Sequence, residues 1–153
     1  MTDTPFRPAT GGCQCGAVRY AAHAPLEKVH YCHCRMCQRA TGNLFAALAG
    51  VPADRLEWLR GEPAWFASSS VARRGFCCRC GTPLSFAYND AARIYVTIGS
   101  LDDPAAVRPE RHYGIESRLP WLHIADDLPH ERTAGNEALR GMSVFQFRPP
   151  ADD

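Results

Sequence analysis

The stretch Cys32-His33-Cys34-Arg35-Met36-Cys37 places three cysteines within one short segment. Two further cysteine groups lie on either side of it along the chain, one at Cys13 and Cys15 and the other at 77–80. Cysteines this close together are poor disulfide partners but good joint ligands of a single metal ion. The grouping therefore predicts a fold organised around bound metal, and it argues against a disulfide framework.

The segment Cys77-Cys78-Arg79-Cys80-Gly81 contains the spacing C-x-x-C-G, which is typical of a zinc knuckle. Cys13 and Cys15 form a second thiolate pair that also ends in a glycine before a strand. Two such pairs complete a tetrahedral site, so we expect Cys13, Cys15, Cys77 and Cys80 to hold a structural zinc ion. Cys78 is more simply explained as a small buried or spare thiol.

Cys32, Cys34 and Cys37 are an odd set of three, which is the pattern of a catalytic zinc with one exchangeable position. Alternatively, a fourth ligand closes this site as well. His30 is one candidate, because it shares a face with Cys32 and Cys34 if that segment is extended. Cys78 is the remaining cysteine that could serve.

Three thiolates give a zinc centre a net negative charge, which makes it a weak Lewis acid and a poor hydrolase. Such a centre is suited to capturing an incoming thiol, which loses its proton as it binds the metal. Arg35 and Arg39 follow within a few residues and could hold the carboxylates of a thiol substrate. They could equally be solvated surface arginines.

The whole chain has 153 residues, the size of one domain, and its apolar content of 46% is ordinary. A net charge of +1 gives no indication of nucleic-acid binding. The longest apolar run, 44–52, is too short to cross a bilayer, so no membrane association is expected. The first residues lack the apolar core of a signal peptide, which favours a cytoplasmic location with reduced thiols.

The pattern of apolar residues predicts a mainly β protein, with small β-sheets organised around zinc knuckles, in a single domain with long loops. The clearest hairpin joins Leu84–Tyr88 to Arg93–Ile98, with Ile94, Val96 and Ile98 on its buried face. The other expected strands are Ala17–Ala22, Lys28–Cys34, Leu56–Arg60, Trp65–Ser69 and Ser143–Phe147, with the strands at 56–60 and 65–69 joined by a turn.

The remaining segments are assigned more coarsely. Residues 1–10 are expected to be a flexible arm, 11–148 the zinc-binding domain and 149–153 a flexible tail. The proline-rich segment 101–131 is expected to form loops over the sheets, and Ala134–Arg140 one short helix. Periodicity does not decide whether Leu44–Ala49 is strand or helix.

With the three cysteine groups in this order, the chain resembles the family of glutathione-dependent formaldehyde-activating enzymes, which also includes centromere protein V. The resemblance covers roughly residues 11–130. The matching segments are Gly12-Cys-Gln-Cys-Gly-Ala-Val-Arg-Tyr20, Cys32-His-Cys-Arg-Met-Cys-Gln-Arg-Ala-Thr-Gly42, Phe76-Cys-Cys-Arg-Cys-Gly-Thr-Pro-Leu84, Gly99-Ser-Leu-Asp-Asp-Pro104 and Glu116-Ser-Arg-Leu-Pro-Trp121.

This resemblance implies a β-rich fold with two zinc ions, divided between the cysteines as above. Because the second site has only three cysteine ligands, we expect it to be only partly occupied by zinc. The resemblance further implies a carbon–sulfur lyase that condenses glutathione with formaldehyde to S-hydroxymethylglutathione. Trp121 joins Arg35 and Arg39 as a candidate for the pocket wall. Fold likeness does not by itself fix the thiol or the aldehyde.

Two other functions compete with the thiol-handling enzyme. A non-catalytic, zinc-stabilised binding module would have its second site closed by His30 or Cys78. A redox or zinc-responsive switch would use exposed thiolates, although metal coordination protects thiols from oxidation. The sequence does not predict the oligomeric state.

Overall fold

The structure, a computed structural model, describes residues 6–143. Within this range the chain forms two β-sheets and one α-helix, joined by loops and single turns of 3-10 helix. The mainly β architecture expected from the sequence is confirmed. No helix between residues 6 and 143 has the length and apolar character needed to span a membrane.

The smaller sheet has three antiparallel strands in the order β1-β2-β5. Its strands are β1 (Ala9–Gly12), β2 (Arg19–Ala22) and β5 (Leu56–Arg60). Ala9 and Thr10, which the sequence assigns to the flexible arm, pair with Ala22 and Ala21. The first cysteine pair lies in the turn between β1 and β2.

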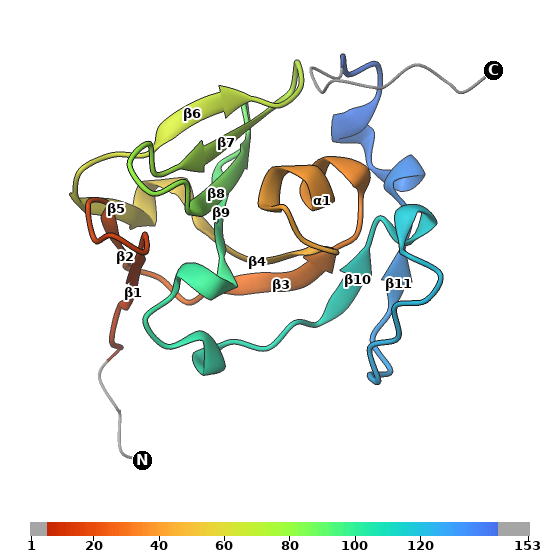
Figure 1. The fold of residues 1–153 in the computed structure, drawn as a ribbon, viewed down its shortest axis with the longest axis horizontal. Coiled ribbons are helices and arrows are strands. Elements are labelled where there is room, and N and C mark those ends of the chain that lie inside the picture. Colours follow the sequence, from red (N-terminus) through yellow and green to blue (C-terminus); the bar gives the residue numbers. More distant parts are fainter. Residues whose placement is uncertain (1–5, 144–153) are drawn as a thin grey trace.

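The larger sheet has eight strands in the order β11-β10-β3-β4-β9-β8-β7-β6. They are β3 (Glu27–Cys32), β4 (Ala46–Pro52), β6 (Ala64–Ala67), β7 (Ala72–Phe76), β8 (Pro83–Tyr88), β9 (Arg93–Thr97), β10 (Arg111–Tyr113) and β11 (His130–Glu131). Pairing is antiparallel except where β10 lies between β3 and β11, parallel to both. β10 thereby brings a late part of the chain beside the cysteines at the end of β3 (Figure 1).

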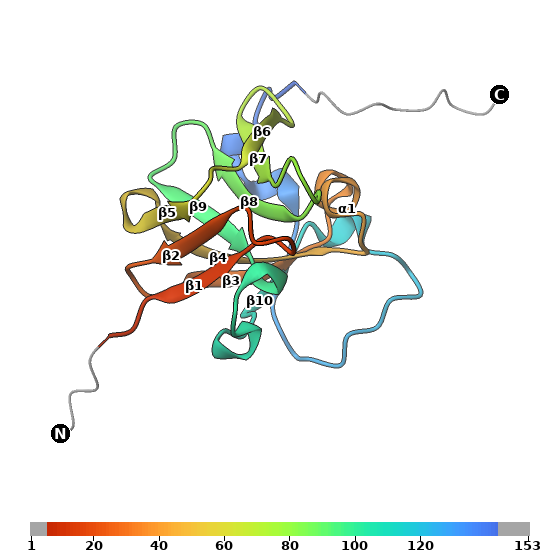
Figure 2. The same ribbon diagram turned by 60° about the vertical axis from the view of Figure 1, so that its left-hand side comes forward.

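The side chains on one face of the larger sheet contribute to the main hydrophobic core. Alternate residues of its central strands, such as Val29, Ala49 and Val96, are buried on this face. The smaller sheet lies across it (Figure 2), and contributes Tyr20, which is fully buried and packs its ring edge-on against Trp58. Because side chains alternate along a strand, the residues between these point to the opposite face.

That opposite face is lined by polar and aromatic side chains. The pairing register places His30 beside Leu48, and Tyr95 beside Phe86. Phe86 in turn lies beside Arg74. The helix α1 (Arg35–Thr41) lies over β4 on this side, near the segment that follows β11 (Figure 1). The first face thus stabilises the fold, and the second builds a site.

Several strand expectations agree with the structure. The hairpin of β8 and β9 is present, and Ile94 and Val96 are buried as expected, whereas Ile98 is half-buried and begins a 3-10 turn. The undecided run at 44–49 contributes most of β4. The expected strand at 28–34 ends at Cys32, because Cys34 already caps α1.

The turn expected between 56–60 and 65–69 does not make a hairpin. β5 pairs with β2 in the smaller sheet, and β6 pairs with β7 in the larger one. The two strands have different partners because Trp58 packs into the core between the sheets, whereas Phe66 is 50% exposed.

The helix expected at 134–140 is also wrong. The segment forms two separate 3-10 turns, Thr133–Gly135 and Glu137–Leu139, with Asn136 between them. The Asn136 side chain accepts a hydrogen bond from the N–H of Ala138 and so begins a new turn, which interrupts a helix too short to be stable alone. The expected strand at 143–147 and the tail at 149–153 lie outside the described residues, apart from Ser143, which is not in a strand.

Candidate metal centres and the pocket beside them

The first cysteine cluster joins the two sheets. The Sγ atoms of Cys13, Cys15, Cys77 and Cys80 all lie within 4.8 Å of one another. The Sγ atom of Cys15 is 3.6 Å from that of Cys13 and 3.8 Å from that of Cys77. Four thiolates at about 2.3 Å from a zinc ion stand about 3.8 Å apart, so this sulfur set fits a tetrahedral zinc.

The local backbone explains why each pair can converge on one point. Gly16 and Gly81 follow the two pairs with positive φ angles of 75° and 76°, a conformation that glycine adopts without strain. The N–H of Gly81 donates to the carbonyl of Cys77 (2.8 Å), which closes the knuckle turn. Hydrogen bonds from the hydroxyl and backbone N–H of Thr82 lower the pKa of Cys80 to about 5, which favours the thiolate that a metal needs.

The second cluster lies where β3 passes into α1. The Sγ atoms of Cys32, Cys34 and Cys37 lie within 4.8 Å of one another, and those of Cys32 and Cys34 are 3.4 Å apart. Cys34 is the N-cap of α1, and its sulfur accepts a hydrogen bond from the N–H of Cys37 (3.4 Å). The helix therefore begins within the C-x-C-x-x-C segment, and this start gathers the three sulfurs.

Arg74, which the sequence did not single out, supports the second cluster. Its side chain is almost fully buried, and its Nη2 atom donates to the Sγ atom of Cys37 (3.4 Å). Hydrogen bonds from the Cys32 and Cys34 thiols lower the pKa of Cys37 well below its usual value, and the charge of Arg74 lowers it further. A buried cation at this position offsets the negative charge of three clustered thiolates.

A pocket of about 730 Å³ opens above the second cluster and is lined by all three of its cysteines. It lies on the polar face of the larger sheet, between α1 and the residues after β11. Its charged lining includes five basic and two acidic residues: Lys28, Arg35, Arg39, Arg74 and Arg111, with Glu116 and Glu131. The charge balance suits a small molecule that carries carboxylates.

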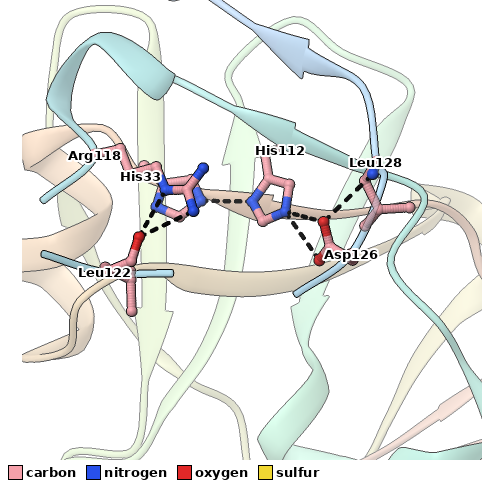
Figure 3. Close-up of polar contacts among 6 residues, drawn as sticks. All are labelled: His33, His112, Arg118, Leu122, Asp126 and Leu128. Carbon is pink, nitrogen blue, oxygen red and sulfur yellow. Dashed lines mark hydrogen bonds and ion pairs between the residues drawn. The ribbon is translucent and has the colours of Figure 1, made fainter. Parts of the chain in front are cut away.

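A buried chain of polar side chains lies behind the second cluster. The ring of His33 is 2.7 Å from that of His112, whose Nε2 atom lies 2.8 Å from a carboxylate oxygen of Asp126 (Figure 3). Since the carboxylate accepts, the neutral ring of His112 has its hydrogen on Nε2, and its Nδ1 atom accepts from His33. The Gln38 side chain donates to the carbonyl of His33 (2.8 Å), so both the ring and the backbone of this residue are held. These contacts hold the Cys32–Cys34 loop in position.

The other candidate residues fall in different places. Arg35 and Arg39 both line the pocket. Trp121 is 64% exposed and is not among the pocket-lining residues. His30 lines the pocket but does not belong to the sulfur cluster, and its Nδ1 atom lies 2.8 Å from the carbonyl of Lys28. Cys78 is exposed and belongs to neither cluster.

The pocket also contains residues that sequence reasoning missed, because no local motif identifies them. Tyr88 and Tyr113 lie at the ends of β8 and β10, and Asn136 comes from the segment that was expected to be a helix. Lys28 is recognisable only from the backbone: it has a φ angle of 50°, unusual for a residue other than glycine, at an irregularity in the pairing of β3 with β4. Strained residues of this kind gather at functional sites.

Two known proteins are similar to parts of this chain. Over 85 residues the chain is 33% identical to a protein of Schizosaccharomyces pombe named as an uncharacterized lyase, a match that covers 56% of this chain and 61% of the relative. The chain thus matches less than two thirds of that protein's length. A crystal structure of a Rhodobacter sphaeroides protein aligns with a TM-score of 0.49 and 23% identity, over 65% of this chain and 91% of that one.

The family profile described as glutathione-dependent formaldehyde-activating enzyme matches residues 8–117, a range that contains all eight cysteines and both clusters. The match covers well over half of the chain. We conclude that this protein belongs to the family of glutathione-dependent formaldehyde-activating enzymes.

Proposed function

We propose that the protein is a zinc-dependent carbon–sulfur lyase that joins a low-molecular-weight thiol to a small aldehyde, or separates the two. Glutathione and formaldehyde are the proposed pair, with S-hydroxymethylglutathione as their adduct. The observation that carries this proposal is the position of the Cys32, Cys34 and Cys37 cluster, which lines a pocket large enough for a small molecule.

The two clusters are proposed to have different roles. Cys13, Cys15, Cys77 and Cys80 form a closed set of four, suited to a structural zinc that fastens the β1–β2 turn to the β7–β8 turn. Cys32, Cys34 and Cys37 offer three ligands and face the pocket, as in zinc sites that keep one position for substrate. A zinc ion bound there would favour the thiolate form of an incoming thiol.

The residues of the chain would then bind and orient the substrate. Arg35 projects from the first turn of α1, beside the cysteines, and its guanidinium is held by the side-chain carbonyl of Gln38. Arg39 lies one helical turn later on the same side. Two guanidinium groups at this spacing can pair with carboxylates of the thiol substrate and so aim its sulfur at the cluster.

Orientation is expected to supply much of the catalysis, because a thiol adds to an aldehyde without an enzyme. When the pocket holds both reactants in the right orientation, the bimolecular reaction in solution becomes an effectively unimolecular step. Both clusters require reduced cysteines, which supports a cytoplasmic location for the protein.

The competing proposal is a non-catalytic binding module with a closed second site. It needs a fourth protein ligand, and neither His30 nor Cys78 lies in the sulfur cluster. The open pocket beside the cluster therefore favours the enzyme.

Cobalt substitution tests the proposed function directly. Glutathione should change the thiolate-to-metal charge-transfer bands of the cobalt-loaded wild type, because the glutathione sulfur would replace an oxygen ligand at the second site. The Cys34→Ser variant should show no such change. Exchange spectroscopy on glutathione and formaldehyde at equilibrium should then show faster interconversion with the protein than without it. If glutathione leaves the cobalt spectrum unchanged, thiol capture is wrong and the binding module takes its place.

A further inference from the structure

Asn136 holds two tyrosine hydroxyl groups side by side in the pocket. Its Nδ2 atom donates to the hydroxyl of Tyr88 (3.0 Å) and to that of Tyr113 (2.9 Å). The two tyrosines end strands β8 and β10, which are not neighbours in the sheet. A residue from a third segment therefore brings them to one point.

The direction of these hydrogen bonds follows from the backbone. The Oδ1 atom of Asn136 accepts from the N–H of Ala138 (3.0 Å), which fixes the orientation of the side-chain amide. The Nδ2 atom has two hydrogens and donates one to each tyrosine oxygen. Each tyrosine oxygen is thus an acceptor, and its own O–H remains available to donate. Across residues 6–143 neither hydroxyl has another hydrogen-bond partner.

Both tyrosines belong to the wall beside the second cysteine cluster. Tyr113 pairs in parallel register with Cys32, so their side chains share one face of the sheet, and Tyr113 packs against the cluster of Cys32 and Cys37. The ring of Tyr88 lies edge-on to Phe86, 5.0 Å between centroids, and Phe86 packs against the same cluster. Burial raises the pKa of both phenols, so each retains its hydrogen at neutral pH.

We infer that Tyr88 and Tyr113, oriented by Asn136, form a two-donor site for the oxygen of a small carbonyl substrate. This inference rests on the proposed function, and it assigns the position of the second reactant. The cysteine cluster takes the sulfur of the thiol, and the tyrosines take the carbonyl oxygen. The two parts of the pocket wall thus hold the two reactants, the thiol by its sulfur and the carbonyl compound by its oxygen.

The chemistry balances without a further reactant. The thiol sulfur forms a bond to the carbonyl carbon, and the π bond of the carbonyl breaks as its electron pair moves to oxygen. The proton that the thiol released returns to that oxygen through solvent, which gives a hydroxyalkyl thioether. Donors already in place stabilise the negative charge as it develops on oxygen, because they need no reorganisation at that moment.

Tyr88→Phe and Tyr113→Phe test this assignment by removing one hydroxyl each. We expect each to lower kcat for adduct formation by about 10²-fold, the usual effect of losing one donor to a developing oxyanion. Glutathione affinity, measured on the cobalt-loaded protein, should remain within about twofold of wild type, since the thiol binds elsewhere. Tyr31→Phe is the matched control: this residue lies on the other face of β3 and outside the pocket, against Phe45.

Asn136→Asp gives a second test that leaves both tyrosines in place. A carboxylate accepts where the amide donates, so the tyrosine O–H groups would turn toward residue 136 and be lost to the substrate. Its other oxygen still caps Ala138. We expect kcat to fall about as far as in the tyrosine variants. In a Tyr88→Phe, Tyr113→Phe background the same change should have no further effect, because no hydroxyl remains to be reoriented.

The outcomes separate this inference from the function on which it rests. If glutathione binds and the wild type accelerates the reaction, but the tyrosine variants keep full kcat, the carbonyl site is wrong while the lyase stands. If glutathione affinity falls together with kcat, the tyrosines bind the thiol, and the assignment is again wrong. If Asn136→Asp lowers kcat equally in the double-Phe background, its effect is one of charge and not of hydrogen-bond direction. Circular dichroism and zinc content identify a variant that fails to fold. If one of the three single variants, Tyr88→Phe, Tyr113→Phe or Asn136→Asp, fails in this way, the other two decide the test.

Discussion

The Nε2 atom of His33 lies 2.7 Å from the Nδ1 atom of His112, and neither imidazole is accessible to solvent. Burial lowers the pKa of His33 to about 4, with the positive charge of Arg118 as a further cause. In the unfolded chain a histidine has a pKa of about 6.5. His33 is therefore still neutral in the folded protein at pH values where it has gained a proton in the unfolded chain.

This difference predicts an acid-dependent loss of stability. Between pH 6.5 and about 4 the unfolded chain binds more protons than the folded one, so the free energy of unfolding falls as the pH falls. The wild type should lose up to about 3 kcal/mol more than His33→Gln over this range. Denaturant titrations at several pH values measure the difference, with zinc content followed at each pH. If the free energy of unfolding falls equally with pH in the two proteins, the lowered pKa of His33 is not the cause of the acid-dependent loss.

Replacing Cys80 by serine should remove the structural zinc and much of the folding free energy. The first cluster joins segments that are distant along the chain, and structural zinc contributes on the order of 10 kcal/mol in small modules, less where a core already exists. Insoluble or markedly less stable protein is expected. Cys78→Ser is the matched control, since Cys78 is exposed and outside the cluster. Equal melting temperatures for the two variants would refute the structural role.

Replacing Cys34 by serine should empty the second site and leave the fold intact. Serine is also a good N-cap, so α1 can still form. Zinc content should fall from about two ions per chain toward one, while the circular dichroism spectrum is unchanged. Mild chelation of the wild type should likewise remove one zinc first, because three ligands hold a metal less tightly than four. Loss of both ions together with the fold would mean that the cysteines are divided incorrectly.

Replacing Arg74 by methionine should weaken metal binding at the second site. The change removes the cation that donates to Cys37 but keeps an apolar stem against Phe86. A hydrogen bond to a charged group contributes about 1.5–3 kcal/mol, which corresponds to a loss in zinc affinity of roughly 10-fold to 100-fold. Competition with a chromophoric chelator measures this affinity. Arg73→Met, on the other face of the same strand and over the Trp65 ring, should bind zinc like the wild type.

The three short cysteine groups and the central hairpin could be predicted because they are local patterns, whereas the meeting of 13–15 with 77–80 was expected from ligand number, since two thiolate pairs complete a tetrahedral site. Short spacings bring thiolates together whatever the rest of the chain does, and the alternation from Leu84 to Val96 spans a pair of strands joined by a tight turn. The placement of Arg35 and Arg39 in the pocket follows for the same reason, since both lie within one helical turn or two of the cysteines.

What the sequence did not predict depends on contacts between distant segments. β10 has three residues and no recognisable periodicity, and it becomes a strand because β3 and β11 flank it. An arginine in a strand is usually exposed, yet the sheet places Arg74 over Phe86 and beside Cys37. The α1 helix was missed because it has only seven residues and its N-cap is Cys34, a residue type that does not mark the start of a helix.

The far wall of the pocket is built by residues that follow the range shared with the family. Thr133, Asn136, Leu139 and Met142 all line the pocket, and all lie beyond residue 117. The metal-binding part and the part that faces it are therefore separate stretches of chain, joined across the pocket by the hydrogen bonds from Asn136 to Tyr88 and Tyr113. We expect changes in this late stretch to alter substrate preference while the cysteine spacing stays the same. Exchanging it between family members is thus a practical way to redirect specificity while keeping both metal centres.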